Sequence, residues 1–153
     1  MAGQLDPIQL MRKIAELEDK INALRTIEIG WHPVFLTTPL TSTSWNGNAY
    51  STTAKTLIDL SAVFGVPAGV KAVLCNCAIR DSASATNEII FILSPNNTNN
   101  QGGYIGAGGL ANDKYGRGML TVPCNINGNI YYQIYASGAN TADIYLEIWG
   151  YWI

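Results

Sequence analysis

The strongest constraint on what this chain can form is a helical repeat near its start, between Asp6 and Arg25. Apolar residues recur there at spacings of four, three, four and three: Leu10, Ile14, Leu17, Ile21 and Leu24. This is a heptad pattern with isoleucine at the a positions and leucine at the d positions, which face a partner helix in a coiled coil. Asp6 suits the N-cap and Pro7 the first helical position. The pattern therefore predicts a short N-terminal coiled-coil α-helix.

Two properties distinguish this helix from one that packs on its own domain, which is the alternative. The apolar stripe is confined to the a and d positions, whereas a helix docked on a globular core usually has a wider one. At about 1.5 Å per residue the helix spans roughly 30 Å, and so short a helix is marginal when it is alone in water. We therefore expect copies of the chain to order it, which makes the protein a homo-oligomer.

After Thr26 the hydrophobic period changes from about 3.6 to 2, beginning with the alternation of Ile27, Ile29 and Trp31. The clearest strand that follows runs from Val70 to Asp81. One face of it is apolar: Val73, Cys75, Cys77 and Ile79. Further strands are expected at residues 56–60, 89–93, 119–123, 130–134 and 144–148.

Turn residues separate these strands. Asn46-Gly47 and Asn127-Gly128 predict type I′ hairpin turns, and the Asn- and Gly-rich segment from Pro95 to Gly109 predicts a surface loop. Seven to nine short strands without a second helix are typical of an antiparallel β-sandwich, here jelly-roll-like. We expect residues 1–29 to form the coiled-coil oligomerisation and attachment helix, and residues 30–153 to form the β-sandwich head domain.

Aromatic residues are concentrated on the last two expected strands, which we interpret as one hairpin. Its core face would be aliphatic, with Ile130 and Ile134 on one strand and Ile144, Leu146 and Ile148 on the other. The opposite face would mix aromatic and polar side chains: Tyr131, Gln133, Tyr135, Asp143, Tyr145, Glu147 and Trp149. Such a mixture is typical of subunit interfaces and of sugar platforms. We assign Tyr131, Tyr135, Tyr145 and Trp149 to an oligomerisation surface, with a sugar site as the alternative.

The sequence offers little for catalysis or metal binding. His32 is the only histidine, and a structural role suits it better than a catalytic one. The three cysteines are expected to be small buried residues rather than zinc ligands. The acidic residues that a glycosidase would need show no paired spacing: Asp81, Glu88, Asp113, Asp143 and Glu147. We therefore expect no enzyme, no metal and no cofactor.

The charge and hydropathy of the chain also bear on its partners. The net charge is −2, only 13% of residues are charged, and Lys and Arg form no cluster. This gives no reason to expect nucleic acid or an anionic membrane surface as a partner. No apolar stretch is long enough to predict membrane insertion, and the N-terminus does not resemble a signal peptide. We expect the chain to be made in the cytoplasm.

Three segments carry a resemblance to known proteins: Asp59–Leu74 (DLSAVFGVPAGVKAVL), Arg80–Ser84 (RDSAS) and Tyr145–Ile153 (YLEIWGYWI). Together with the short coiled coil and the low-charge, Asn-, Thr- and Gly-rich composition, they resemble the fibre, tail and decoration proteins of tailed bacteriophages. The resemblance extends from about Leu57 to the end, and in general style over the helix. It implies a homotrimer on the virion, although isoleucine at a with leucine at d favours two-stranded coils.

Three functions follow as hypotheses. The first is a structural component of a phage virion, a homotrimeric fibre- or decoration-type surface protein that contacts other virion proteins and, as a further expectation, a host surface glycan. A dimer is the alternative oligomer. The second is a soluble, lectin-like carbohydrate-binding module without catalytic activity. The third, a depolymerising enzyme, has the least support because the sequence contains no convincing catalytic site.

Overall fold

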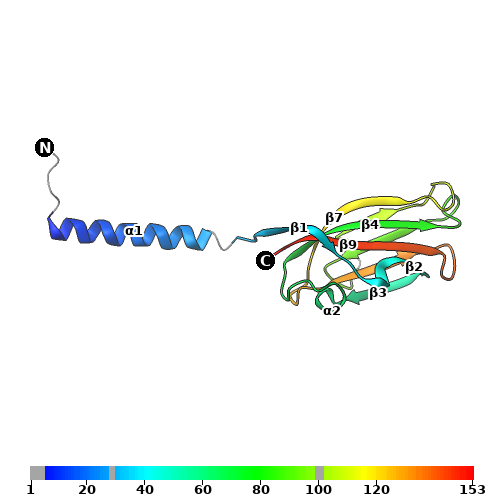
Figure 1. Ribbon diagram of the computed structural model, residues 1–153, viewed down its shortest axis with the longest axis horizontal. Coiled ribbons are helices and arrows are strands. Elements are labelled where there is room, and N and C mark those ends of the chain that lie inside the picture. Colours follow the sequence, from blue (N-terminus) through cyan, green and yellow to red (C-terminus); the bar gives the residue numbers. More distant parts are fainter. Residues whose placement is uncertain (1–5, 28–29, 99–101) are drawn as a thin grey trace. The chain divides into compact units, whose positions relative to one another are not determined.

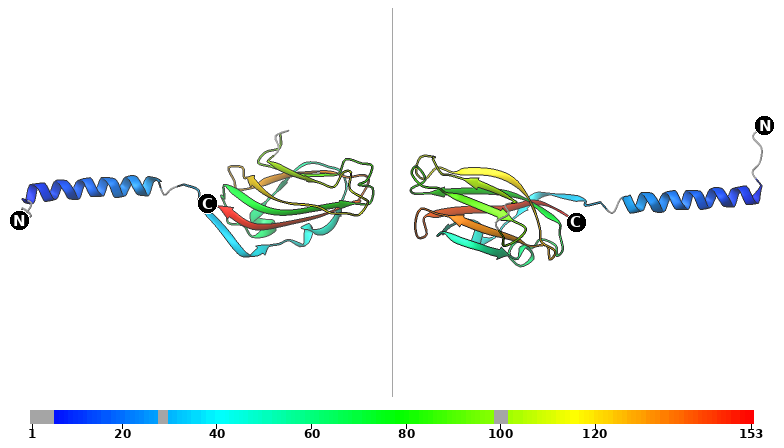
Figure 2. Two further views of the ribbon diagram at one scale, coloured as in Figure 1. Left: turned by 90° about the horizontal axis from the view of Figure 1, so that it is seen from above. Right: turned by 180° about the vertical axis from the view of Figure 1, so that it is seen from behind.

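The computed structural model describes residues 6–27, 30–98 and 102–153, with the helix side chains described as far as residue 22. The chain divides into two compact units, Met1–Trp31 and His32–Ile153, and each is considered by itself. Figures 1 and 2 show a helix in the first unit and strands in the second. The expectation of a mainly β protein with an N-terminal helix is confirmed.

The helix of the first unit, α1, comprises Pro7–Ile27. One carboxylate oxygen of Asp6 accepts hydrogen bonds from the backbone N–H groups of Ile8, at 2.8 Å, and Gln9, at 2.9 Å. Asp6 therefore caps the helix as its sequence position predicts.

The strand expected from Ile27 onward is wrong. Ile27 belongs to α1, Ile29 lies outside the described residues, and Trp31 is not in a strand. Extending an existing helix adds one hydrogen bond for each residue that is ordered, whereas a strand needs a partner for its backbone. The first partner is met at Pro33, which pairs with Trp152.

The second unit consists, within the described residues, of two antiparallel sheets. Sheet A has the strand order β1–β9–β4–β7, with β2 also paired to β9, and sheet B has the order β3–β8–β5–β6. The strands are β1 Pro33–Leu40, β2 Asn46–Tyr50, β3 Thr53–Ile58, β4 Ala72–Asp81, β5 Ile90–Ser94, β6 Gly103–Gly106, β7 Gly116–Pro123, β8 Ile130–Tyr135 and β9 Ala142–Trp152.

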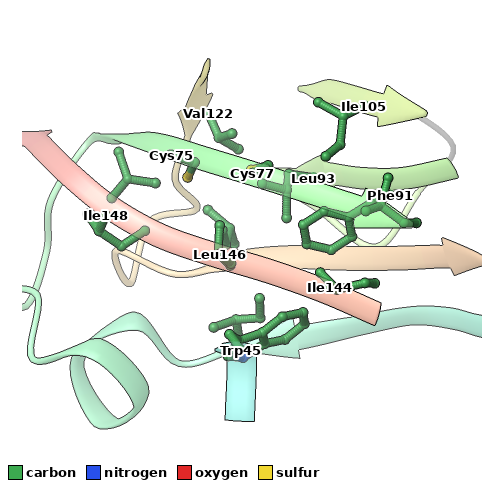
Figure 3. Packing of buried hydrophobic residues seen from close by; sticks show 14 of the residues in the cluster. Trp45, Cys75, Cys77, Phe91, Leu93, Ile105, Val122, Ile144, Leu146 and Ile148 are labelled. Carbon is green, nitrogen blue, oxygen red and sulfur yellow. The ribbon is translucent and has the colours of Figure 1, made fainter. Parts of the chain in front are cut away.

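The two sheets enclose one apolar core (Figure 3). The predicted inward row of β4 is confirmed, because Val73, Cys75, Cys77 and Ile79 are all buried. Burial of each large aliphatic side chain contributes about 1.5–3 kcal/mol. Trp45, in the 3-10 helix Thr43–Trp45, closes one part of the core and stacks on Tyr50 with ring centroids 5.1 Å apart.

A short second helix, α2, was not predicted. It comprises Leu60–Phe64 and buries the side chains of both end residues. Asp59 caps it by accepting a 3.0 Å hydrogen bond from the N–H of Ala62, and Gly65 ends it with a φ of 74°. The expected loop from Pro95 to Gly109 is also wrong in part, because it contains β6, which pairs with β5.

Neither predicted type I′ hairpin is present. That turn needs positive φ at both central residues, and Gly128 has it while Asn127 does not. The turn at Asn127 joins β7 of sheet A to β8 of sheet B, so the two strands do not pair. Asn46 has a φ of −112° and Gly47 lies within β2, where the pairing with β9 is irregular.

Candidate functional site

The four aromatic residues assigned to one surface lie on two surfaces. Ile130 and Ile134 of β8 and Ile144 and Ile148 of β9 are buried in the shared core, as predicted. However, β8 belongs to sheet B and β9 to sheet A, so they do not form the expected hairpin. Because successive side chains of a strand point to opposite faces, the aromatic residues of β8 and β9 project away from the core in opposite directions. The single aromatic face is therefore wrong.

Tyr131 and Tyr135 lie on the outer face of sheet B. Tyr131 is paired with Leu57 and Ser94, and Tyr135 with Ile90. The Gln133 side chain between them donates a 3.1 Å hydrogen bond to the Tyr135 hydroxyl. Other apolar side chains on this face leave it largely uncharged: Leu57, Ile90, Ile92 and Tyr104.

Tyr145 and Trp149 lie on the outer face of sheet A, where polar side chains dominate. The register places Ala78 between Tyr145 and Arg117, and Asn76 beside Glu147. A depression of about 270 Å³ lies on this face. Its lining comes from β4, β9 and the start of β7: Asn76, Ala78, Tyr115, Arg117, Tyr145 and Glu147. We call it the sheet A depression.

Ala78 creates the depression because its methyl group stands in a row of longer side chains. Its outward neighbours on β4 are Asn76 and Arg80, and its cross-strand neighbours are Tyr145 and Arg117. Ala78 itself is only 8% exposed. It therefore forms the floor, and the larger side chains form the walls.

Glu147 is held in place by two donors. The Asn76 amide donates to its Oε2 at 3.0 Å, and the Trp149 indole N–H donates to the same oxygen at 3.1 Å. Within the described part of the chain, Oε1 accepts no hydrogen bond, which leaves a fixed acceptor at the depression.

Tyr115 forms the opposite wall and is fixed by two guanidinium groups. The Arg80 and Arg117 groups lie 5.1 Å and 4.8 Å from its ring centroid, at distances typical of cation–π contacts. Its ring meets that of Tyr145 edge-on, with centroids 5.8 Å apart. Burial and a hydrogen bond with Tyr145 raise the pKa of Tyr115, so both phenols are neutral near pH 7.

Arg80 is anchored by Asp143. Its Nε donates to the Asp143 Oδ2 at 2.8 Å, and a terminal nitrogen lies 2.7 Å from the same oxygen, the one ion pair among the residues described. The hydrogen bond with Asp143 raises the pKa of Arg80. Arg117, by contrast, is exposed and forms no ion pair in the described regions.

Tyr145 owes its position to Gly47 of β2. Gly47 has a φ of +78°, and a Cβ atom added to it would collide with the Tyr145 hydroxyl group. The residue lies at the irregular pairing of β2 with β9, where a glycine admits the close approach. Sequence reasoning took the same glycine for a hairpin turn and so missed its role.

The predicted oligomerisation stripe of α1 is exposed. Leu10, Ile14, Leu17 and Ile21 are between 48% and 57% exposed. Leu24 lies beyond the described side chains. An apolar stripe of this kind needs a cover to remain stable in water.

The other predicted absences receive only limited tests. The described residues contain no group of three or more His, Cys, Asp or Glu side chains that could hold a metal ion. They also contain no helix long and apolar enough to cross a membrane. Asp81 is fully buried and serves the fold, because Ala83, Ser137 and Thr141 all donate hydrogen bonds to its carboxylate.

No protein-family model matches the chain, and comparison with curated proteins also found no match. The interpretation of the site therefore rests on its geometry.

Proposed function

We propose that this chain is a homo-oligomeric structural component of a phage virion, with α1 as its oligomerisation and attachment helix. The observation that carries the oligomer is the exposure of the a and d residues. Ile14 and Ile21, which a monomer would leave in water, occupy the seam of a coiled coil. Burying them between copies of α1 removes that exposed surface.

Within this proposal the β unit is a jelly roll. Its strand order supports this, because β2–β9–β4–β7 and β3–β8–β5–β6 form two four-stranded antiparallel sheets from consecutive crossings between them. That arrangement is typical of viral capsid domains and lectins. The finding agrees with the fold expected from the sequence resemblance to phage fibre and decoration proteins.

The number of copies is three in this proposal. Isoleucine at a with leucine at d favours dimers in long parallel coils, but α1 has fewer than three heptads. Contacts between β units therefore set the number, and the outer face of sheet B is the more apolar candidate for them.

Sedimentation equilibrium tests the oligomer. The full chain should give three times the mass of one chain, and deletion of residues 1–29 should weaken the association. A monomeric full chain would contradict the proposal. Mass spectrometry of purified phage particles from a genome that carries this gene tests the virion assignment, since the chain should be present in the particle.

A lectin-like carbohydrate-binding protein is the second candidate. The specific observation in its favour is the sheet A depression, which combines aromatic rings with fixed polar groups. The same depression serves the adhesive role that the virion proposal includes.

A further inference from the structure

We propose that the sheet A depression binds one pyranose ring of a neutral glycan. This inference deepens the adhesive part of the proposed function and rests on it for its biological role. The binding itself depends only on residues of the β unit: Asn76, Ala78, Tyr115, Arg117, Tyr145 and Glu147.

The size of the depression suits a single ring. Its volume of about 270 Å³ corresponds to roughly nine water molecules at about 30 Å³ each. A monosaccharide unit and its hydroxyl groups displace water on that scale, whereas an extended oligosaccharide has to continue along the outer face of sheet A. The site is therefore expected to read one residue of a longer glycan.

The chemistry of the walls matches adjacent hydroxyl groups. The free Oε1 of Glu147 accepts a hydrogen bond, and the exposed guanidinium of Arg117 donates several. Between them lie the Ala78 methyl group and the Tyr145 ring, which offer apolar surface to the C–H face of the sugar. Acceptor, donor and apolar floor are the three contacts that a pyranose ring needs.

The walls are already ordered before a ligand arrives. Asn76 and Trp149 hold Glu147, while Arg80 and Arg117 hold Tyr115 from its ring faces. Ordered side chains lose little freedom on binding, so more of the contact energy appears as affinity. A surface without a ligand has no evident need for this order.

The charges around the depression favour a neutral sugar. Residues 30–153 contain eleven charged side chains, and four of them stand on this face: Arg80, Arg117, Asp143 and Glu147. Two are positive and two negative, and Glu147 lies at the wall itself. An anionic sugar would gain from Arg117 but would be repelled by Glu147, so the balance selects uncharged hydroxyl groups.

A shallow site of this kind binds weakly on its own, with a dissociation constant in the millimolar range. Linking several copies raises the effective concentration of the second and third sites, so the whole assembly binds a surface more tightly. The oligomer of the proposed function thus supplies the strength that one depression lacks.

Two-dimensional ¹H–¹⁵N NMR of the full chain tests the site. The probes are methyl β-D-glucopyranoside, methyl β-D-galactopyranoside and methyl α-D-mannopyranoside, with methyl β-D-glucuronide as the anionic comparison. The reporter is the Trp149 indole N–H, which donates to Glu147 and is assigned from its absence in W149F. At least one neutral hexoside should shift this resonance in a saturable way, and the glucuronide should bind more weakly.

Two variants locate the binding. A78V fills the floor and E147Q removes the charged acceptor, and each should weaken the hexoside about tenfold or more. A54V, at an exposed position on β3 of sheet B, and E88Q, at an exposed loop residue, are matched controls that should bind as the original chain does.

Several results would overturn the inference. They are the absence of any shift with all three neutral hexosides, tighter binding of the glucuronide, or unchanged affinity in both A78V and E147Q. Sedimentation of the same samples separates this failure from that of the proposed function. A trimer that binds no hexoside contradicts only the ligand site, and a monomer that binds at Trp149 contradicts only the oligomer.

Discussion

The hydroxyl of Thr141 donates a 2.8 Å hydrogen bond to Oδ2 of Asp81 and so ties the segment before β9 to the last residue of β4. Ser137 adds its backbone N–H, at 3.1 Å, and its hydroxyl, and Ala83 adds its N–H at 2.9 Å. The carboxylate thus organises the connection that carries the chain from sheet B to sheet A. Correct pairing of β9 with β4, which builds the sheet A depression, depends on this connection.

Replacing Asp81 with Asn should destabilise the fold in a pH-dependent way. Burial acts to raise the pKa of Asp81, but the hydrogen bonds from Ser137, Ala83 and Thr141 outweigh it, and the pKa is lowered. The charged form therefore stabilises the fold above the unfolded pKa of about 3.9. This contribution is lost as the pH falls through the lower pKa of the folded state.

We expect D81N to lower the free energy of unfolding by about 2 kcal/mol at pH 7, measured by urea denaturation. The difference from the original chain should shrink below about pH 4, where protonation of the carboxyl group begins to cost the original chain the same interactions. E88Q, at an exposed loop position, is the control and should have little effect. A D81N effect that stays constant from pH 7 to pH 3 would contradict this account.

Substitution of Gly47 by Ala tests the support of Tyr145. Gly47 and Gly69 have nearly the same φ, +78° and +77°, so Ala is strained at both, by about 1 kcal/mol. Only at Gly47 would the new Cβ meet another side chain, that of Tyr145; at Gly69 no atom lies within 4 Å. G47A should therefore destabilise the chain more than G69A in thermal unfolding. Equal losses would show that Tyr145 moves aside freely.

Much of the β unit could be predicted from alternation alone. The inward rows of β4, β8 and β9 are apolar at every second residue, and those rows are buried. Alternation cannot say which strands pair, however, because that depends on contacts distant in sequence. Tyr135 and Tyr145 are ten residues apart, yet their strands belong to different sheets. The predicted hairpin failed for this reason.

The depression was outside the reach of sequence reasoning because its parts come from separate strands. Tyr145 and Glu147 were both assigned to the aromatic–polar face, but their partners Asn76, Ala78 and Tyr115 carry no local signal. Only the register of β4 with β7 and β9 brings them together. The Asn46-Gly47 pair was a signal of a special backbone position, although its purpose is a close approach to Tyr145 and not a turn.

The cysteines should be unreactive in the folded chain. Burial raises the pKa of Cys124 to about 12, and a hydrogen bond with Cys77 together with burial raises that of Cys75. Since the thiolate is the reactive form, a disulfide reagent at pH 8 should modify the folded protein very slowly and all three cysteines in guanidinium chloride. The thermal midpoint should not change with EDTA. Rapid modification, or a midpoint lowered by EDTA, would contradict these expectations.

Aspartate at both Ile14 and Ile21 should separate the α1 helices. Each substitution would bury an unpaired charge in the seam, at a cost of several kcal/mol. Circular dichroism should lose its helical part and keep its β signal. A15D is the control, because Ala15 lies beside the seam and is exposed. If the double variant remains as helical as A15D, α1 is not held by a coiled coil.

The two outer faces should separate adhesion from assembly. The outer face of sheet B exposes apolar side chains, with Leu57 46%, Tyr104 59% and Tyr135 38% exposed. A patch of this kind on a monomer favours coverage by another subunit. The sheet A face carries fixed charges around a depression and suits a ligand. Each face supplies two of the aromatic residues predicted to assemble the protein.

The comparison uses residues 30–153, which contain the complete β unit, so that α1 cannot mask the result. Y131A/Y135A should lower the mass measured by sedimentation while hexoside binding at Trp149 persists. Y145A/W149A should leave the mass unchanged and abolish hexoside binding, which is followed here by saturation-transfer NMR because the indole reporter is gone. Both double variants remove two aromatic rings from an outer face, so each controls for the other. A lower mass in Y145A/W149A alone would instead make the sheet A face the subunit interface, because only a contact made there is lost with those two rings.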